Sequence, residues 1–146
     1  MDQFYKYERY QNEIVYDDFS LGQVFPAFRY QITLAHVEAY YAAVKDGVRG
    51  EIIPDARKHP LFPSLVSLSY GFVYSAIGGR LPQGFLNSTV DLNLISPAPV
   101  GHDLKMIVTV EDKQIKRERK HLMLSASVAD ASGLPIAAAR IGCVIP

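Results

Sequence analysis

An apolar segment without a single charged residue runs from Ser64 to Ile77. It is too short to cross a bilayer, which takes about 20 apolar residues. An apolar element of about four turns that lacks a polar stripe is typical of a helix enclosed on all sides. Gly78 and Gly79 follow, and glycine adopts at low cost the left-handed conformation that ends helices. The pattern therefore predicts a buried central helix over residues 64–77.

The next segment, Phe85 to Leu94, alternates apolar and polar positions, which predicts a half-buried strand. Further strands are expected at 24–32, 102–115, 120–129 and 136–145. Thr33 is a good N-cap for a helix whose apolar positions recur at helical spacing. These positions are Leu34, Val37, Tyr41 and Val44. The stretch from Lys45 to Pro63 is broken by proline and glycine, so we expect a long loop there, and such loops are usually functional or mobile.

The predicted order of elements indicates an α+β fold. It is a strand, a helix, a loop, a buried helix and then four antiparallel strands. The expected architecture is a single hot-dog domain, in which an antiparallel sheet wraps around one long central helix. Residues 1–146 form this domain, and residues 1–16, rich in tyrosine and charge, form an N-terminal arm. The chain length suffices to bury a substantial core.

Charge and cysteine content narrow the range of functions. Lys and Arg together number 15, as do Asp and Glu, so the net charge is zero and nucleic-acid binding is not expected. A neutral surface also does little to oppose self-association. The single cysteine, Cys143, lies in an apolar run and is expected to be buried. No signal peptide or membrane span is visible at the N-terminus, so we expect a cytoplasmic protein.

Several stretches of the chain resemble the MaoC-like dehydratases, a hot-dog family that includes the (R)-specific enoyl-CoA hydratases. The similarity extends over residues 17–144. It is clearest at residues 18–25, 41–46, 77–89 and 97–102. The last stretch, Pro-Ala-Pro-Val-Gly-His, matches the family's Pro-x-Pro-Val-Gly-Asp turn except for its final residue, His102. The resemblance implies an acyl-CoA thioester substrate, with coenzyme A present only as part of that substrate and no separate cofactor.

In this family, a Gly-Asp-x-Asn-Pro-x-His motif after the first helix holds a water molecule between its Asp and its His and adds it across the double bond of an enoyl thioester. Asp46 matches the motif's Asp, but Glu51 stands where the His belongs. The nearest downstream candidate is His59, in a His-Pro-Leu-Phe-Pro segment like that of non-catalytic halves of double hot-dog hydratases. The resemblance thus assigns catalysis to Asp46 and His59. From the residues alone, the favoured alternatives are that Asp46 is an acid at the end of a helix and that His59 is a loop histidine that caps a backbone group.

The family binds the thioester carbonyl through a His-Gly pair on the central helix, and that pair aligns with Ser69 and Tyr70. Substrate-binding residues implied by the resemblance are therefore Ser69, Tyr70, Gly71 and Ser75. Because Tyr70 replaces a glycine, we expect it to narrow or reroute the pocket. Alternatively, the tyrosine is a core residue and the Ser75 hydroxyl bonds the carbonyl one turn back.

Three functions remain open at this point. The first is an enoyl-CoA hydratase or 3-hydroxyacyl-CoA dehydratase. The second is a catalytically silent subunit that binds acyl-CoA or a partner hydratase chain, and the third is a hot-dog thioesterase. A homodimer or larger hot-dog assembly is expected, because an open sheet leaves an unpaired edge. The alternative is a hetero-oligomer with a catalytic MaoC-like chain. No metal site is expected. The basic run 113–120 either meets the phosphates of coenzyme A or is a solvated turn.

Overall fold

The computed structural model describes residues 12–47 and 55–146, with the backbone alone for residues 45–47. Its helical elements are η3 (Tyr16–Asp18), α1 (Leu34–Gly47), η4 (Ala56–Lys58), α2 (Phe62–Val66) and α3 (Tyr70–Ile77). Its strands are β1 (Phe28–Gln31), β2 (Leu86–Leu94), β3 (Asp103–Lys116), β4 (Arg119–Asp130) and β5 (Pro135–Ile145).

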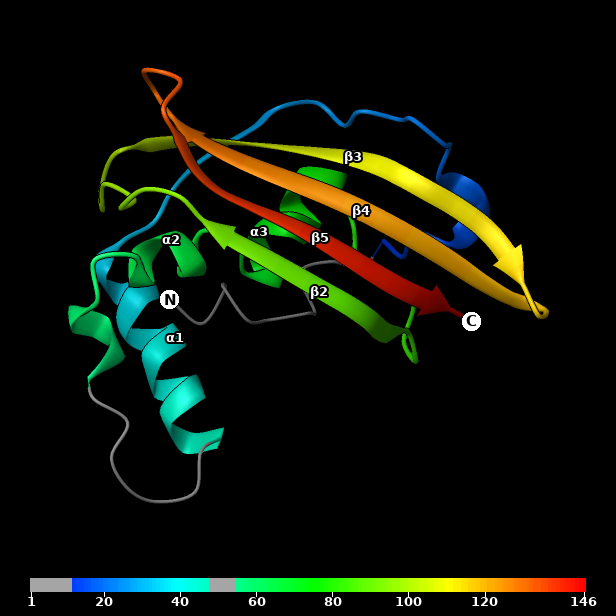
Figure 1. Cartoon of the computed structure of the whole chain (residues 1–146), viewed down its shortest axis with the longest axis horizontal. Coiled ribbons are helices and arrows are strands. Elements are labelled where there is room, and N and C mark those ends of the chain that lie inside the picture. Colours follow the sequence, from blue (N-terminus) through cyan, green and yellow to red (C-terminus); the bar gives the residue numbers. More distant parts are fainter. Residues whose placement is uncertain (1–11, 48–54) are drawn as a thin grey trace.

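The strands form one sheet in the order β1-β3-β4-β5-β2, and every neighbouring pair is antiparallel. The sheet is a curved layer with α3 against its concave side, while α1 and α2 lie beside the C-terminal end of β2 (Figure 1). The expected α+β architecture, a sheet wrapped around a helix, is confirmed.

The core lies between α3 and the concave face of the sheet. Strands β3 and β4 send every second side chain into it, as their burial patterns show. The inward side chains of these two strands are Leu104, Met106, Val108, Val110, Leu122, Leu124, Ala126 and Val128. Helix α3 contributes Phe72, Val73, Tyr74, Ala76 and Ile77. Cys143 on β5 is buried as expected, and burial raises the pKa of its thiol to about 11.

The central helix is not continuous, which corrects the expectation of one helix over 64–77. Helix α2 ends at Val66 and α3 begins at Tyr70, with Ser69 extended between them at φ −59° and ψ 148°. The Ser69 hydroxyl donates to the Val66 carbonyl, and the Ser67 hydroxyl donates to the Ser64 carbonyl at 2.6 Å. Serine hydroxyls that bond nearby carbonyls compete with the helical pattern, which explains the break.

Tyr30 on β1 holds this break against the sheet. Its hydroxyl donates to the Ser67 carbonyl at 2.8 Å, and its ring lies 4.5 Å from that of Phe72 between centroids. Burial raises the pKa of Tyr30 well above its ordinary value, so the hydroxyl keeps its proton and remains a donor. The predicted stop at the other end of the helix is confirmed. Gly78 has φ 80°, and its N–H donates to the Tyr74 carbonyl at 2.9 Å.

The first predicted strand, 24–32, shortens to β1. Before it, Val24 forms only an isolated bridge with Thr109. Pro26 explains the gap, because proline has no N–H to donate to a neighbouring strand. In α1 the helix is confirmed, but two residues expected on its buried face are exposed: Leu34 (66%) and Val44 (40%). The predicted loop 45–63 begins too early, because α1 continues to Gly47; it also contains η4 and the start of α2, and its residues 48–54 lie outside the described part.

Strand β2 departs from its predicted half-buried state. The pairing with β5 is irregular between Asn87 and Thr89, where a bulge adds Ser88. A Cβ atom on the opposing residue, Gly142, would lie 2.8 Å from the Ser88 hydroxyl and 2.4 Å from that of Thr89, so only glycine leaves room for both. Along the whole strand the side chains are exposed, apart from the half-buried Leu94. Strand β2 is an edge strand whose central side chains, Val90 and Leu92 among them, stay exposed.

Candidate functional site

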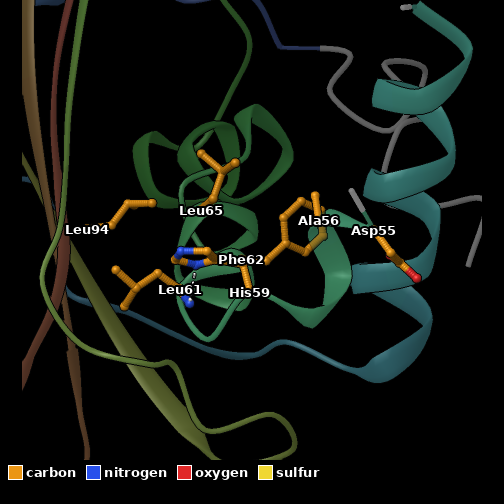
Figure 2. Close-up of a pocket in the computed structure, with 7 residues that line it drawn as sticks. All are labelled: Asp55, Ala56, His59, Leu61, Phe62, Leu65 and Leu94. Carbon is orange, nitrogen blue, oxygen red and sulfur yellow. Dashed lines mark hydrogen bonds between the residues drawn. The ribbon is translucent and has the colours of Figure 1, made fainter. Parts of the chain in front are cut away.

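An apolar cavity of about 440 Å³ lies where η4 and α2 meet the end of β2. It is lined by Asp55, Ala56, His59, Leu61, Phe62, Leu65 and Leu94. Leu94 comes from the sheet, and the other lining residues come from the segment before the central helix (Figure 2). Cavities of this size with mostly apolar walls and a few polar groups are typical of small-molecule sites.

The segment that carries the cavity is held against α1 by Arg57. Its guanidinium bonds Glu38 of α1 at 2.6 Å and Asp55 at 2.7 and 2.8 Å. The same group lies 4.3 Å from the centre of the Tyr41 ring, a cation–π contact. Arg57 thus joins η4 to two side chains of α1, and its planar, bidentate group restricts their relative orientation.

Asp55 is a poor candidate for a proton donor. Hydrogen bonds from the Arg57 side chain, above all, lower the pKa of Asp55 to about 2, so the carboxyl is ionised at neutral pH. In Figure 2 its carboxylate points away from the leucine side chains of the cavity. The carboxylate also accepts the Arg57 backbone N–H at 3.1 Å and so caps η4. Its role in this arrangement is to position the segment.

His59 is the titratable ring in the cavity wall. Its Nδ1 accepts the backbone N–H of Leu61 at 3.1 Å, which is the capping arrangement that the sequence left open. A neutral imidazole whose Nδ1 accepts carries its proton on Nε2. The ring lies among the leucine side chains in Figure 2. His59 therefore offers one N–H donor to a group bound in an otherwise apolar space.

The predicted partner of His59 lies outside the described side chains. Asp46 is in the last turn of α1, where only the backbone is described. Glu51, which replaces the motif's His, lies in the undescribed segment 48–54. A water site shared by Asp46 and His59 therefore stays a prediction.

The predicted substrate-binding residues lie along α3, three of them at its N-terminal end and Ser75 in its second half. Ser69 is the N-cap residue, and its hydroxyl is bonded to the Val66 carbonyl. The Ser75 hydroxyl donates to the Gly71 carbonyl at 2.9 Å, one turn back. None of Ser69, Tyr70, Gly71 and Ser75 is among the described residues that line the His59 cavity. Within one chain, the predicted site residues fall into two separate groups.

Tyr70 reaches toward the start of β2 rather than its end. Its hydroxyl donates to the Asn87 side-chain oxygen at 2.7 Å, and its ring packs 5.6 Å from Tyr74 and 6.2 Å from Phe85 between centroids. The side chain is half-buried. The predicted occlusion of a pocket by Tyr70 stays a prediction.

Sequence reasoning missed most of the cavity wall. Leu61 and Phe62 were noticed only as letters of the His-Pro-Leu-Phe-Pro segment, and Arg57 was not singled out. The useful signal is an apolar pair that follows a candidate histidine after one proline. Leu94 gave no such signal, because it lies more than thirty residues further along the chain and joins the site only through the fold.

Two broader properties bear on the site. Within residues 12–47 and 55–146, no three His, Cys, Asp or Glu side chains are grouped so as to hold a metal ion. No helix in the described part of the chain has the length and apolar character of a membrane span.

Comparison with known proteins adds the fold relationship. No protein-family model and no curated protein matches the sequence. Among solved structures, a MaoC-like dehydratase from Rhodospirillum rubrum is similar with a TM-score of 0.62 at 18% identity, over 90% of this chain and 96% of the other. The unliganded R-hydratase PhaJ1 from Pseudomonas aeruginosa is similar with a TM-score of 0.63 at 17% identity, over 92% and 86%.

The chain has the hot-dog fold of these proteins. A thioesterase superfamily member from Thermus thermophilus is also similar, with a TM-score of 0.52 at 18% identity, over 87% of this chain and 83% of the other. Hot-dog structures with different described activities thus share this architecture. The function must be argued from the site, because one fold can support several chemistries.

Proposed function

We propose that this hot-dog protein binds an acyl-CoA thioester with the acyl chain in the His59 cavity and hydrates its α,β double bond. The observation that supports the proposal most is the apolar cavity with one imidazole in its wall. It lies on the segment between the first helix and the central helix, where the resembled family carries its catalytic residues. Apolar walls suit an alkyl chain, and the imidazole suits proton transfer.

The proposed reaction adds the elements of water. One of Asp46 and His59 takes a proton from the water as its oxygen bonds to the β-carbon. The electron pair of the double bond then forms the new C–H bond at the α-carbon, with a proton that the other residue delivers. General acid–base groups of this kind typically contribute about 10²–10⁴-fold each.

A hydration assay tests this proposal. Crotonyl-CoA and longer enoyl-CoAs lose their conjugated absorbance on hydration, so the rate is read spectrophotometrically. We expect Asp46→Asn and His59→Gln each to lose about 10²–10⁴-fold in rate. The matched controls are Asp17→Asn and His102→Gln. Both change exposed residues distant in sequence from the cavity segment, so both variants should keep the full hydration rate.

A second candidate is the catalytically silent subunit, and one contact favours it. The Nδ1 atom of His59 is engaged by its own backbone, as in a structural cap, which leaves one ring nitrogen for chemistry. A wild-type protein that binds acyl-CoA saturably but hydrates no enoyl-CoA would establish this function and exclude the first. The thioesterase alternative has less support, because residues 64–77 contain no Asp or Glu to act as a base.

We also propose that two hot-dog chains associate through β2. The strand has an unpaired edge, and its inward side chains Val90 and Leu92 are 48% and 49% exposed. An exposed, apolar edge strand favours pairing with another strand. A two-fold antiparallel pairing over the full strand would set Leu94 of one chain opposite Leu86 of the other. The Tyr70–Asn87 group of one chain would then approach the His59 cavity of its partner, uniting the two groups of predicted residues.

The partner in this association is either a second copy or a catalytic MaoC-like chain. Light scattering of the purified protein distinguishes them. A dimer mass with only this chain present supports the homodimer, while a monomer at micromolar concentration that gains mass only with the second chain supports the hetero-oligomer.

A further inference from the structure

A second hollow, of about 540 Å³, lies at the tip of the β3–β4 hairpin. It is lined by Lys116, Arg117, Arg119 and His121, all basic side chains. Lys116 pairs with Arg119, and Gln114 pairs with His121. These pairs alternate with the inward residues of the two strands, so the hollow lies on the convex face of the sheet.

This tip concentrates positive charge in a chain that has none overall. Residues 112–121 contain five Lys or Arg and two Asp or Glu, a local charge of +3, so the rest of the chain carries −3. Among the residues that the structure describes, Lys116, Arg117 and Arg119 form no ion pair. Unneutralised cations around one hollow attract anions and raise their local concentration.

Two further charged groups of the hairpin, Lys113 and Asp112, are engaged elsewhere. The Lys113 ammonium donates to the Phe19 carbonyl at 2.7 Å and lies 4.3 Å from the centre of the Tyr16 ring. The Asp112 carboxylate accepts the Lys113 N–H at 2.9 Å and the Gln114 amide at 3.1 Å. Glu118 at the turn is the one carboxylate within the 116–121 segment. One negative charge against Lys116, Arg117 and Arg119 leaves a net positive charge around the hollow.

The turn itself is unusual. Arg117 and Glu118 have φ values of 52° and 63°. A two-residue hairpin turn with both central residues at positive φ is favoured by Asn-Gly, because other side chains are strained there. Strained positions that persist without an evident structural reason are candidates for function. An arginine at this strained turn position is therefore a candidate for a functional role.

We propose that this hollow binds a phosphorylated small molecule that carries at least two phosphate groups, such as a nucleoside bisphosphate. Guanidinium groups bind phosphate oxygens in a bidentate manner, and guanidinium and imidazole planes stack on nucleobases. Three cations match more than one phosphate, and the volume lies in the range of nucleotide-sized ligand sites. The phosphates come either from a free nucleotide or from the nucleotide end of coenzyme A.

The hairpin hollow is separate from the His59 cavity of the same chain. The hairpin adjoins the end of the sheet where Lys120 pairs with Ile145, whereas Leu94 pairs with Ala137 at the other end. Eight residues of strand separate those positions on β5, about 26 Å at 3.3 Å per residue. The two sites also lie on opposite faces of the sheet. This proposal therefore stands or falls independently of the hydratase proposal.

Isothermal titration calorimetry tests the proposal on the full chain. The probes are adenosine 3′,5′-bisphosphate, coenzyme A and adenosine, at low and high salt. We expect the bisphosphate to bind saturably at one site per chain, more weakly at high salt, and adenosine to bind far more weakly. Equal affinity for coenzyme A and the bisphosphate identifies a free nucleotide as sufficient. At least tenfold tighter binding of coenzyme A identifies the thioester carrier as the source.

Two variants separate binding from folding. Arg119→Ala removes one cation and should weaken bisphosphate binding roughly tenfold. Arg117→Asn removes another cation but suits the positive φ of the turn, so it should weaken binding while the melting temperature rises or is unchanged. The matched control is Arg29→Ala, which removes a cation from an exposed position of β1, and it should bind the bisphosphate as the wild type does. Absence of bisphosphate binding to the wild type, or equal binding by Arg119→Ala, Arg117→Asn and Arg29→Ala, would overturn the proposal.

Discussion

Strands β4 and β2 have the same alternation of apolar and polar residues but opposite surroundings. In β4 the inward side chains, Leu122 and Leu124 among them, are 2% exposed. In β2 the corresponding inward side chains Val90 and Leu92 are about half exposed. An alternating pattern thus tells which side of a strand faces inward, but not whether anything covers it. What covers β4 is α3 of the same chain, and we propose that what covers β2 is another chain.

The same contrast extends to the elements beside each strand. The region under β4 is held by buried apolar packing, whereas η4, which has no buried residue, is held to α1 by exposed polar contacts such as Arg57–Glu38. Buried packing contributes most to stability, and exposed ion pairs contribute little. The η4 side of the candidate cavity is therefore less firmly held than the core, as is common for ligand-binding segments.

The largest expected difference is between equivalent truncations in the two strands. Leu124→Ala should lower the free energy of unfolding by about 2–5 kcal/mol, because it leaves a cavity in the core. Leu92→Ala should cost less than about 1 kcal/mol within the folded chain, because its side chain is already half exposed. Urea unfolding at low protein concentration measures both. Equal losses would contradict the contrast between the two strands.

A charge on β2 should act on association rather than on folding. Leu92→Lys places an ammonium group on the face that we propose is covered, so it should convert the assembly to monomers. The matched control is Leu134→Lys, which changes an equally exposed residue in the β4–β5 turn and should leave the mass of the assembly unchanged. Light scattering measures the mass. If Leu92→Lys keeps the wild-type assembly, β2 is not the interface.

The Arg57 contacts should matter for the cavity more than for the fold. Arg57→Ala removes the link between η4 and α1, and we expect acyl-CoA binding to weaken roughly two- to fivefold, in keeping with exposed ion pairs. Lys58→Ala removes a neighbouring exposed charge and should have no effect. Titration of both variants with the same acyl-CoA compares them. A similar affinity for the two would show that the Arg57 contacts do not shape the cavity.

The smallest expected effect is a pH dependence at the start of α1. The Thr33 N–H donates to His36 Nδ1 at 3.0 Å, and the His36 N–H donates to the Thr33 hydroxyl at 3.2 Å, a reciprocal cap. Burial, chiefly, lowers the pKa of His36 in the folded state. This contribution to stability is therefore complete above the unfolded-state pKa of about 6.5 and is lost as the pH falls below it.

We expect this loss to be less than about 1 kcal/mol, since the group is partly exposed and a helix cap contributes about that much. Thermal unfolding between pH 7.5 and 5.5 measures it. His36→Gln is the control, because glutamine at this position also accepts the capping bond but does not titrate. If the wild type and His36→Gln show the same pH dependence, another group is responsible.

Much of the fold could be predicted because its information is local. The strands β3, β4 and β5 began and ended within one or two residues of the alternation in the sequence, and the glycine pair marked the end of α3. The break before Tyr70 was missed because an apolar run conceals it. Only the tertiary bond from Tyr30 to Ser67, together with the bonds of the serine hydroxyls, shows why the chain turns there.

The candidate site was less predictable. His59 was identified from a short motif, but the wall opposite it, Leu94, belongs to a strand that the sequence gives no reason to place beside it. The arrangement of Arg57 between two carboxylates also depends on the packing of η4 on α1, which no local pattern encodes. Sites assembled from distant segments follow from the fold, so they become visible only once the fold is known.

The central claim is that the His59 cavity holds the acyl chain, and a cavity-filling variant tests it most directly. Leu94→Trp should occupy the cavity with an indole ring, while Leu134→Trp adds the same side chain to an exposed turn outside it. We expect calorimetry with decanoyl-CoA to show at least tenfold weaker binding for Leu94→Trp and unchanged binding for Leu134→Trp. Wild-type affinity in a correctly folded Leu94→Trp protein would contradict the claim.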